Sequence, residues 1–103
     1  MSHVHLSFIV ATHNDAADIH ARIGEAQRQL AGVTDQYEIV IVDDGSNDGT
    51  SHVVDQLEQG DSRRLRVVHL SRRVGQKAAL EAGIAAAHGT FIAHARPLPN
   101  THS

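Results

Sequence analysis

A run of four β-branched residues that leads straight into two carboxylates constrains this chain more than any other feature. Residues 39–42 (Ile-Val-Ile-Val) do not alternate with polar residues, which is typical of a strand covered on both faces in a parallel sheet. Asp43 and Asp44 follow directly, and a turn-rich segment occupies residues 45–50. Ligands of such sheets bind outside the carboxyl ends of the strands. The two aspartates are therefore predicted to lie at a binding or catalytic site.

Strand and helix patterns alternate along the whole chain. Apolar strand patterns occupy residues 6–11, 38–42, 65–70 and 91–95. Between them lie three helical patterns, whose apolar residues are Ile19, Ile23, Ala26 and Leu30, then Val53, Val54 and Leu57, then Leu80, Ile84 and Ala87. The predicted fold class is α/β, a Rossmann-like βαβαβαβ arrangement with a mostly parallel four-stranded sheet.

The helix ends are predicted from capping residues. Asn14 or Asp15 is expected to cap the first helix, which Gly32 closes. The second helix is expected to start from Ser46, Asp48 or Thr50 and to end before Gly60. The third is predicted over residues 76–88, after Gly75 and before Gly89. Gly83 inside it would cost about 1 kcal/mol relative to alanine, which close packing against the sheet would explain.

Length and composition indicate one domain. Residues 1–95 are predicted to form it, and residues 96–103, a short polar tail, begin with an Arg-Pro-Leu-Pro segment that cannot continue a central strand. An exposed sheet edge is expected, which a second copy or a partner chain would cover. No apolar run approaches the ~20 residues of a membrane helix, no signal-peptide pattern is present, and the chain has no cysteine. A cytoplasmic location is expected, at the membrane face only through a partner.

Charge is distributed unevenly. Residues 1–61 contain eleven acidic and two basic residues, and residues 62–103 contain seven basic residues and one acidic residue. Such asymmetry marks an anion-binding half or two halves that complement each other in the fold. An aromatic content of 3% leaves little surface for base stacking, so no nucleic-acid partner is predicted. The nine histidines lack metal-ligand spacing, so they predict no metal site.

Three predicted strand ends meet at one edge of the sheet, at residues 12–15, 43–46 and 71–77. Carboxylates there could accept hydrogen bonds from a base or a ribose. Arg72, Arg73 and Lys77 could neutralise phosphate together with the helix N-terminus. A single nucleotide would use both the carboxylates and the basic residues. The alternatives are that the aspartates serve only the turn while the arginines face solvent, or that the aspartates form the acidic pocket of a small flavodoxin-like regulatory domain.

Three segments resemble the family-2 glycosyltransferases, inverting enzymes of the GT-A fold, and most of all their polyprenyl-phosphate (dolichol-phosphate mannose synthase-like) branch. Residues 42–50 (Val-Asp-Asp-Gly-Ser-Asn-Asp-Gly-Thr) match the segment that ends the family's second strand. Residues 11–15 (Ala-Thr-His-Asn-Asp) resemble its first turn. Residues 70–75 (Leu-Ser-Arg-Arg-Val-Gly), followed by Ala-Ala-Leu and Gly83, resemble its third unit. The resemblance covers almost the whole chain and implies the N-terminal, nucleotide-binding half of that fold.

The resemblance implies a nucleotide-diphosphate sugar as ligand. By it, Asp44 hydrogen-bonds the base, the backbone of residues 11–13 lines the same pocket, and Arg72 and Lys77 lie on the phosphate side. Asp15 matches an acidic position of the family, and Asp43 belongs to the same strand end. The nucleotide-binding residues predicted in this way are Ala11, Thr12, His13, Asp15, Asp43, Asp44, Arg72 and Lys77.

One departure from the family pattern bears on catalysis. The family holds Mg²⁺ or Mn²⁺ with an Asp-x-Asp at the end of its fourth strand, where this chain has Arg96-Pro97-Leu98, and no carboxylate follows Glu81. Loss of those ligands would remove metal-assisted departure of the nucleotide. The catalytic residues therefore stay unassigned. We expect a truncated, inverting glycosyltransferase domain that binds its donor, with a non-catalytic nucleotide-binding or interaction module as the alternative.

Overall fold

The computed structural model describes residues 4–95. Within them, strands and helices alternate in the order βαβαβαβ. The strands are β1 (Leu6–Thr12), β2 (Tyr37–Asp44), β3 (Leu65–Leu70) and β4 (Phe91–His94), and the helices are α1 (Ile19–Ala31), α2 (Thr50–Gly60) and α3 (Gln76–Ala86). All neighbouring strands pair in parallel, in the spatial order β3-β2-β1-β4. The predicted α/β fold is confirmed. The predicted tail, residues 96–103, lies outside the described residues.

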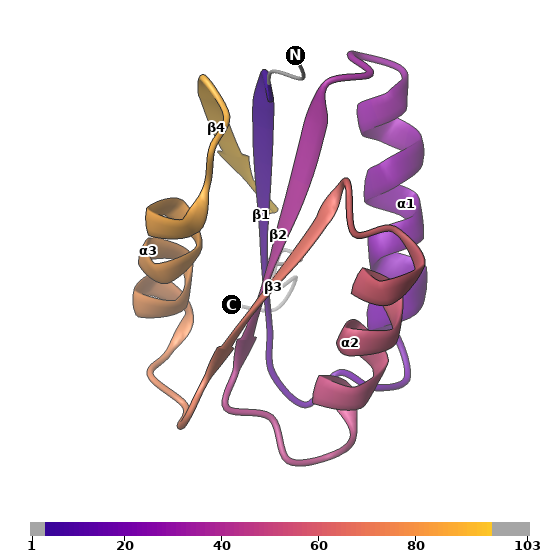
Figure 1. The fold of residues 1–103 in the computed structure, drawn as a ribbon. Helices are drawn as coiled ribbons and strands as arrows, with labels where there is room; N and C mark the ends of the chain where they lie inside the picture. The colour runs from indigo at the N-terminus through magenta and orange to yellow at the C-terminus, as the bar shows by residue number, and fades with distance from the viewer. Residues whose placement is uncertain (1–3, 96–103) are drawn as a thin grey trace, which may run out of the picture.

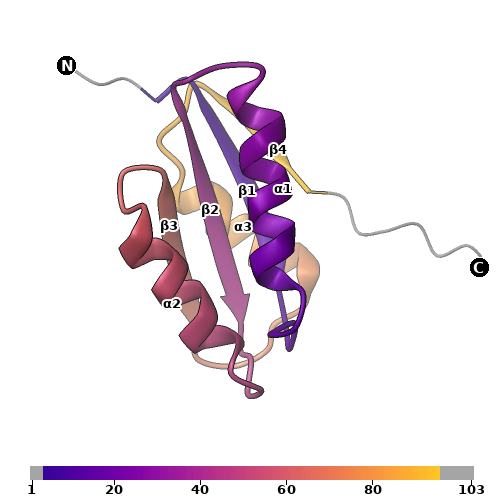
Figure 2. The ribbon, with the colours of Figure 1, turned by 90° about the vertical axis from the view of Figure 1, so that its right-hand side faces the viewer.

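The sheet is covered on both faces, by α1 and α2 on one side and by α3 on the other (Figures 1 and 2). Under α1 and α2, the core includes Ile23, Ile41 and Val54; under α3 it includes Val42 and Ala79. Every residue of β2 is buried, which explains why its sequence shows no alternation of apolar and polar residues. Successive residues of β2 therefore reach opposite layers of the protein.

Helix α3 packs against the sheet through its smallest residues. Ala79 and Gly83 are its buried positions, whereas Ile84 is 44% exposed. The predicted inner face of Leu80, Ile84 and Ala87 is thus rotated toward Gly83. A Cβ atom on Gly83 would lie 2.4 Å from Ile9 Cγ2 and 2.9 Å from Val42 Cγ2. The expected reason for a glycine inside this helix, close packing on the sheet, is confirmed.

The helix ends agree with the capping predictions only in part: α1 ends before Gly32 and α3 begins after Gly75, as expected, but the other ends differ. Helix α1 begins at Ile19 after Asp18 rather than after Asn14 or Asp15, and α2 begins after Gly49. Asn14 has φ of 50°, outside the range of a helix, and the loop around it bonds to the turn that precedes α2. Helix α3 ends at Ala86 because Ala87 is already extended. Long-range bonds between loops therefore replaced the local caps that the sequence offered.

Both β3 and β4 are edge strands among the described residues. Phe91 and Ile92 on β4 are 58% and 45% exposed. Their apolar side chains are consistent with the predicted partner or second copy at an open edge, which stays a prediction. None of the helices between residues 4 and 95 has the length and hydropathy of a membrane span.

A buried carboxylate ties the amino ends of the strands together, at the end of the sheet opposite Asp43 and Asp44. Glu38 is 3% exposed, and its Oε2 accepts hydrogen bonds from Ser7 Oγ (2.6 Å) and from the backbone N of His88 (2.6 Å). Burial alone would raise the pKa of Glu38, but these two hydrogen bonds, together with the charges of Arg66 and His88, lower the pKa below its usual value. The loop between α3 and β4 is fixed by this contact.

We expect Gly83→Ala to lower the free energy of unfolding by about 1 to 2 kcal/mol, because overpacking outweighs the gain in helix propensity. Gly24→Ala is the matched control in α1. Its Cβ would meet only Arg28 Nη1, at 3.9 Å, so that variant should gain about 0.5 to 1 kcal/mol. Urea unfolding followed by circular dichroism measures both. Equal stabilisation by the two substitutions would contradict the packing described for α3.

Candidate functional site

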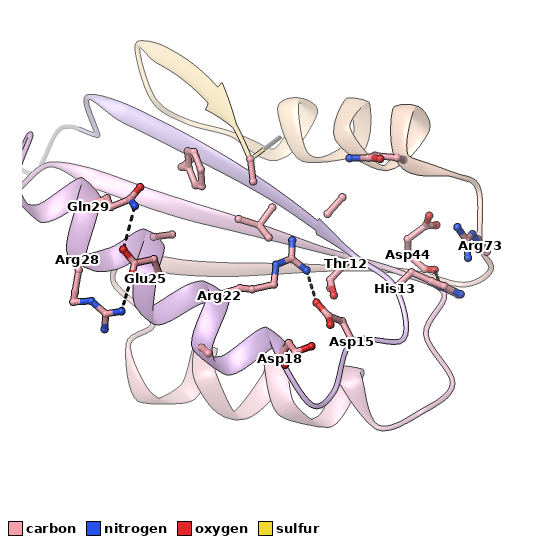
Figure 3. Close-up of a pocket in the computed structure, with 17 residues that line it drawn as sticks. Thr12, His13, Asp15, Asp18, Arg22, Glu25, Arg28, Gln29, Asp44 and Arg73 are labelled. Atoms are coloured by element: carbon pink, nitrogen blue, oxygen red, sulfur yellow. Dashed lines mark hydrogen bonds and ion pairs between the residues drawn. The ribbon is translucent and has the colours of Figure 1, made fainter. Parts of the chain in front are cut away.

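A groove opens at the carboxyl end of β1. The pairing of β4 with β1 ends at Ile9 and His94, so β1 continues for three residues past its neighbour. The groove there has a volume of about 1080 Å³, slightly above the roughly 300 to 1,000 Å³ of typical small-molecule sites. Its lining residues include Ala11, Thr12, His13, Asp15, Arg22, Asp44, Arg73 and Gln76 (Figure 3).

Asp44 lies in this groove and also holds the loop between β3 and α3. Its Oδ1 accepts the backbone N–H of Val74 (2.8 Å), and its Oδ2 accepts that of Gly75 (3.0 Å). Gly45 allows this loop to approach, because a Cβ on Gly45 would lie 2.4 Å from both Arg72 C and Arg73 N. The Asp-Gly pair is thus required by backbone geometry before any ligand is considered.

His13 connects the ends of β1 and β2. Its Nδ1 donates to the backbone carbonyl of Asp44 over 2.6 Å. A neutral imidazole that donates from Nδ1 keeps Nε2 as an acceptor. The histidine therefore offers a second hydrogen-bonding atom to the groove that it lines.

Thr12 carries the one buried side-chain polar atom without a hydrogen-bond partner among residues 4–95. The residue is 3% exposed, and its Oγ1 makes no hydrogen bond there. Buried hydroxyls normally have a partner, because leaving one unpaired costs about 1 to 3 kcal/mol. Thr12 lies beside the other polar residues of the groove (Figure 3). Such a hydroxyl at the mouth of a parallel sheet is the kind of group that a ligand would pair.

Asp15 is not a free carboxylate. It forms an ion pair with Arg22 of α1, drawn as a dashed line in Figure 3. Its backbone N–H donates to Thr50 Oγ1 over 2.8 Å. The acidic position that the resemblance singled out therefore lies on the groove wall already neutralised by a cation. The sequence analysis did not identify Arg22, although its position seven residues after Asp15 on an exposed helix face was a usable signal.

Asp43 faces the opposite layer from Asp44. Its Oδ1 accepts the backbone N–H of Ser46 (3.2 Å), and its Oδ2 accepts Ser51 Oγ and His69 Nδ1. Burial alone would raise the pKa of Asp43, but these hydrogen bonds outweigh it and lower the pKa. The structure does not bring Asp43 into the groove, so the two aspartates do not act as a pair.

Four hydrogen bonds join the loop between β1 and α1 to the turn between β2 and α2. Asn14 N donates to Ser46 Oγ (2.9 Å), and Asn47 N donates back to Asn14 Oδ1 (2.8 Å). The remaining two run from Asp15 N to Thr50 Oγ1 and from Ala16 N to Asp48 Oδ2. The polar residues of the turn, expected to cap α2, thus position one wall of the groove, and Asp48 in addition accepts the first backbone N–H of α2, that of Thr50.

The basic residues divide into two groups. Arg73 lines the groove, as does the uncharged Gln76, whereas Arg72 and Lys77 do not. All four are exposed. From their charge, Arg72, Arg73 and Lys77 are all predicted to neutralise phosphate. The family resemblance implies this role for Arg72 and Lys77 alone. Which of them faces the groove depends on the path of the loop against Gly45, which local sequence does not specify.

The described residues were tested for a metal site. They contain no group of three or more His, Asp or Glu side chains placed to hold an ion. In the groove, Asp15 is paired with Arg22 and Asp44 accepts two backbone N–H groups. The described residues therefore do not fit the divalent cation that the resemblance implied, and no step is derived through it.

A parallel α/β sheet with a polar groove at its carboxyl edge is a Rossmann-like arrangement, in which ligands bind outside the carboxyl ends of the strands. The model of the family "Glycosyl transferase family 2" matches residues 7–94, and the chain belongs to this family. It is 28% identical over 87 residues to an undecaprenyl-phosphate 4-deoxy-4-formamido-L-arabinose transferase of Aeromonas hydrophila, covering 84% of this chain and 27% of the relative. It is 32% identical over 88 residues to a dodecaprenyl-phosphate galacturonate synthase of Rhizobium johnstonii, covering 85% and 26%.

A solved structure shares the fold. The mannosyltransferase PcManGT of Pyrobaculum calidifontis, in complex with GDP-Man and Mn²⁺, superposes with a TM-score of 0.72 at 25% identity. The match covers 89% of this chain and 27% of that one. The chain thus spans about a quarter of the length of each of these three proteins.

Replacement of the unpartnered hydroxyl tests the geometry of the groove in the absence of ligand. We expect Thr12→Val to raise the free energy of unfolding by about 1 kcal/mol, because it removes a buried polar atom that has no partner. Thr50→Val is the control, because the Thr50 hydroxyl accepts from Asp15 N and donates to Asp48. That variant should lose about 1 to 3 kcal/mol. Equal losses in urea unfolding would show that Thr12 has an internal partner.

Proposed function

We propose that this chain is the donor-binding part of an inverting glycosyltransferase, and that its groove holds the nucleotide of a nucleotide-diphosphate sugar. The observation that carries the proposal is the buried, unpartnered hydroxyl of Thr12 at the carboxyl edge of the sheet, in one groove with Asp44 and Arg73. A hydrogen-bond acceptor would bind the nucleoside and a cation would bind the phosphates. A single nucleotide would use both groups.

Asp44 and Thr12 are assigned to the nucleoside. An ionised carboxylate has about four lone-pair sites, and the Val74 and Gly75 N–H groups use two of those on Asp44. The remaining sites can accept an N–H of the base. The Thr12 hydroxyl can donate or accept, which suits a base edge or a ribose hydroxyl. His13 Nε2 adds an acceptor beside them.

Arg73 and the N-terminus of α3 are assigned to the diphosphate. Arg73 lines the groove, and a guanidinium binds phosphate in two-point geometry. Helix α3 has eleven residues, and the free N–H groups of its first turn attract anions. Arg72 and Lys77 lie outside the groove lining but near this turn, so their charges would act at longer range and would be screened by salt.

The comparisons support a sugar nucleotide over other nucleotides. The archaeal structure contains GDP-Man, and both bacterial relatives are named for sugar transfer to or synthesis on a polyprenyl phosphate. The residues described here bind and orient a donor in this proposal. Transfer to an acceptor belongs to the whole protein that the relatives represent.

A non-catalytic module is the second candidate. It would bind the nucleotide in the same groove without sugar transfer. The observation consistent with it is that the carboxylates of the groove are engaged by Arg22 and by backbone N–H groups, so binding would not depend on a divalent cation.

Isothermal titration calorimetry with UDP, GDP and dTDP, each with and without Mn²⁺, tests the site. We expect one of them to bind the 103-residue chain, and Thr12→Val and Arg73→Gln each to weaken binding about five- to tenfold, as the loss of one hydrogen bond or charged contact predicts. Arg63→Gln is the charge-matched control, because Arg63 precedes β3 at the opposite end of the sheet and should change affinity less than twofold.

Each outcome decides between the candidates. Metal-dependent binding together with release of sugar from a labelled donor would support the enzyme, and binding unchanged by Mn²⁺ without release would support the non-catalytic module. The nucleotide site itself is wrong if no nucleotide binds at millimolar concentration, or if Arg63→Gln weakens binding as much as Arg73→Gln.

A further inference from the structure

His69 lies at the carboxyl end of β3, between two carboxylates from other elements. Its Nδ1 is 2.9 Å from Oδ2 of Asp43, on β2, and its Nε2 is 2.7 Å from Oδ1 of Asp55, on α2. Asp43 is buried, and the side chains of His69 and Asp55 are 41% and 48% exposed. The three groups form a bridge between β2, β3 and α2, on the opposite face of the sheet from Asp44.

The geometry of this bridge requires a proton. An ionised carboxylate can only accept hydrogen bonds, and a neutral imidazole has one N–H. With both partners ionised, a neutral His69 would direct a lone pair at one of them. Only the imidazolium donates to Asp43 and Asp55 together.

Apart from His69 itself, the described residues that line the small cavity beside it include no basic side chain. The small cavity beside it is lined by Asp43 and Asp55 as the only other titratable side chains, together with Gly45, Ser46, Asn47, Ser51, Leu70 and Ser71. Glu58 of α2 also faces β3, where it accepts the backbone N–H of Val67. Burial alone would lower the pKa of His69, but the hydrogen bonds to Asp55 and Asp43 outweigh it and raise the pKa above its usual value.

The bridge is connected to the groove by hydrogen bonds. The Asp43 carboxylate accepts a hydrogen bond from His69 and also accepts hydrogen bonds from the backbone N–H of Ser46 and the hydroxyl of Ser51. Ser46 Oγ in turn accepts Asn14 N, and Thr50 Oγ1 accepts Asp15 N. Asp15 lines the groove. A displacement of Asp43 would therefore reach the groove wall through the turn between β2 and α2.

We propose that His69 is a positioning residue whose imidazolium, held by Asp43 and Asp55, locks the turn between β2 and α2 and so fixes the loop of Asn14 and Asp15, of which Asp15 lines the groove. The effect on nucleotide affinity rests on the proposed function; the effect on the loop does not. Deprotonation leaves one carboxylate without a donor, which loosens the turn and lowers affinity.

The pH window follows from the directions of the two pKa shifts. His69 has a raised pKa in the folded state, so its stabilising contribution is fully present below the unfolded value of 6.5 and is lost as pH rises through the folded pKa. Asp43 has a lowered pKa, so its contribution is present above the unfolded value of 3.8 and is lost as pH falls through the folded pKa. Both charges of the bridge are therefore present at pH values between the folded-state pKa of Asp43 and the folded-state pKa of His69.

Nuclear magnetic resonance of the 103-residue chain tests the proposal without any ligand. We expect the His69 ring, assigned by its loss in His69→Gln, to titrate above 6.5, the pKa value of histidine in an unfolded chain. The backbone amides of Asn14 and Asp15 should shift with the His69 midpoint. This component of the amide shifts, the one with the His69 midpoint, should vanish in His69→Gln and remain in the control His52→Gln. In Asp55→Asn, which removes only the partly exposed carboxylate, its midpoint should move to lower pH.

The affinity test uses the nucleotide that binds best in calorimetry. We expect its Kd to rise about fivefold between pH 6 and pH 8.5, a typical coupling between two sites, and the rise to disappear in His69→Gln but not in His52→Gln. The proposal is overturned if His69 titrates at or below 6.5, or if the Asn14 and Asp15 amides keep this component of their titration in His69→Gln. If no nucleotide binds while the amides follow His69, the proposed function fails and the positioning role stands.

Discussion

The arrangement of this protein depends on two buried carboxylates at the end of one central strand. Asp43 and Asp44 are 2% and 3% exposed, and each satisfies its oxygens with groups from neighbouring loops. Asp44 holds the backbone of the loop before α3, and Asp43 holds the turn before α2 together with His69. Because successive residues of a strand face opposite ways, one dipeptide fixes the loops on both sides of the sheet.

This division of roles explains the glycines and hydroxyls that surround the aspartates. Gly45 lets the loop before α3 pass within contact of the strand end. Ser46, Asp48 and Thr50 bond to the first loop of the chain, and Asp48 also accepts the backbone N–H of Thr50 at the start of its own helix. A ligand would then meet a preformed groove in which most polar groups are already paired. The Thr12 hydroxyl is the exception among the described residues, and the nucleotide proposal starts from it.

Much of the fold could be predicted from local pattern. The buried run before Asp43 indicated a central parallel strand, and the alternating helix and strand periods predicted the βαβαβαβ order. The matched motifs also led to the correct family, to which the whole of residues 7–94 belongs. The starts of α1 and α2 and the buried face of α3 could not be predicted, because hydrogen bonds between segments 32 to 35 residues apart and the packing of Gly83 on Ile9 override local preference.

The sequence by itself determined that acidic, hydroxyl and basic residues gather at the carboxyl edge of a parallel sheet, because strand polarity and short connections allow no other place for them. Only the tertiary structure decided which of them share a groove. Strand pleat sends Asp43 away from Asp44, the approach of a loop to Gly45 brings Arg73 rather than Arg72 to the groove, and an ion pair with Arg22 occupies Asp15. These outcomes depend on contacts between distant segments, which residue type and spacing do not encode.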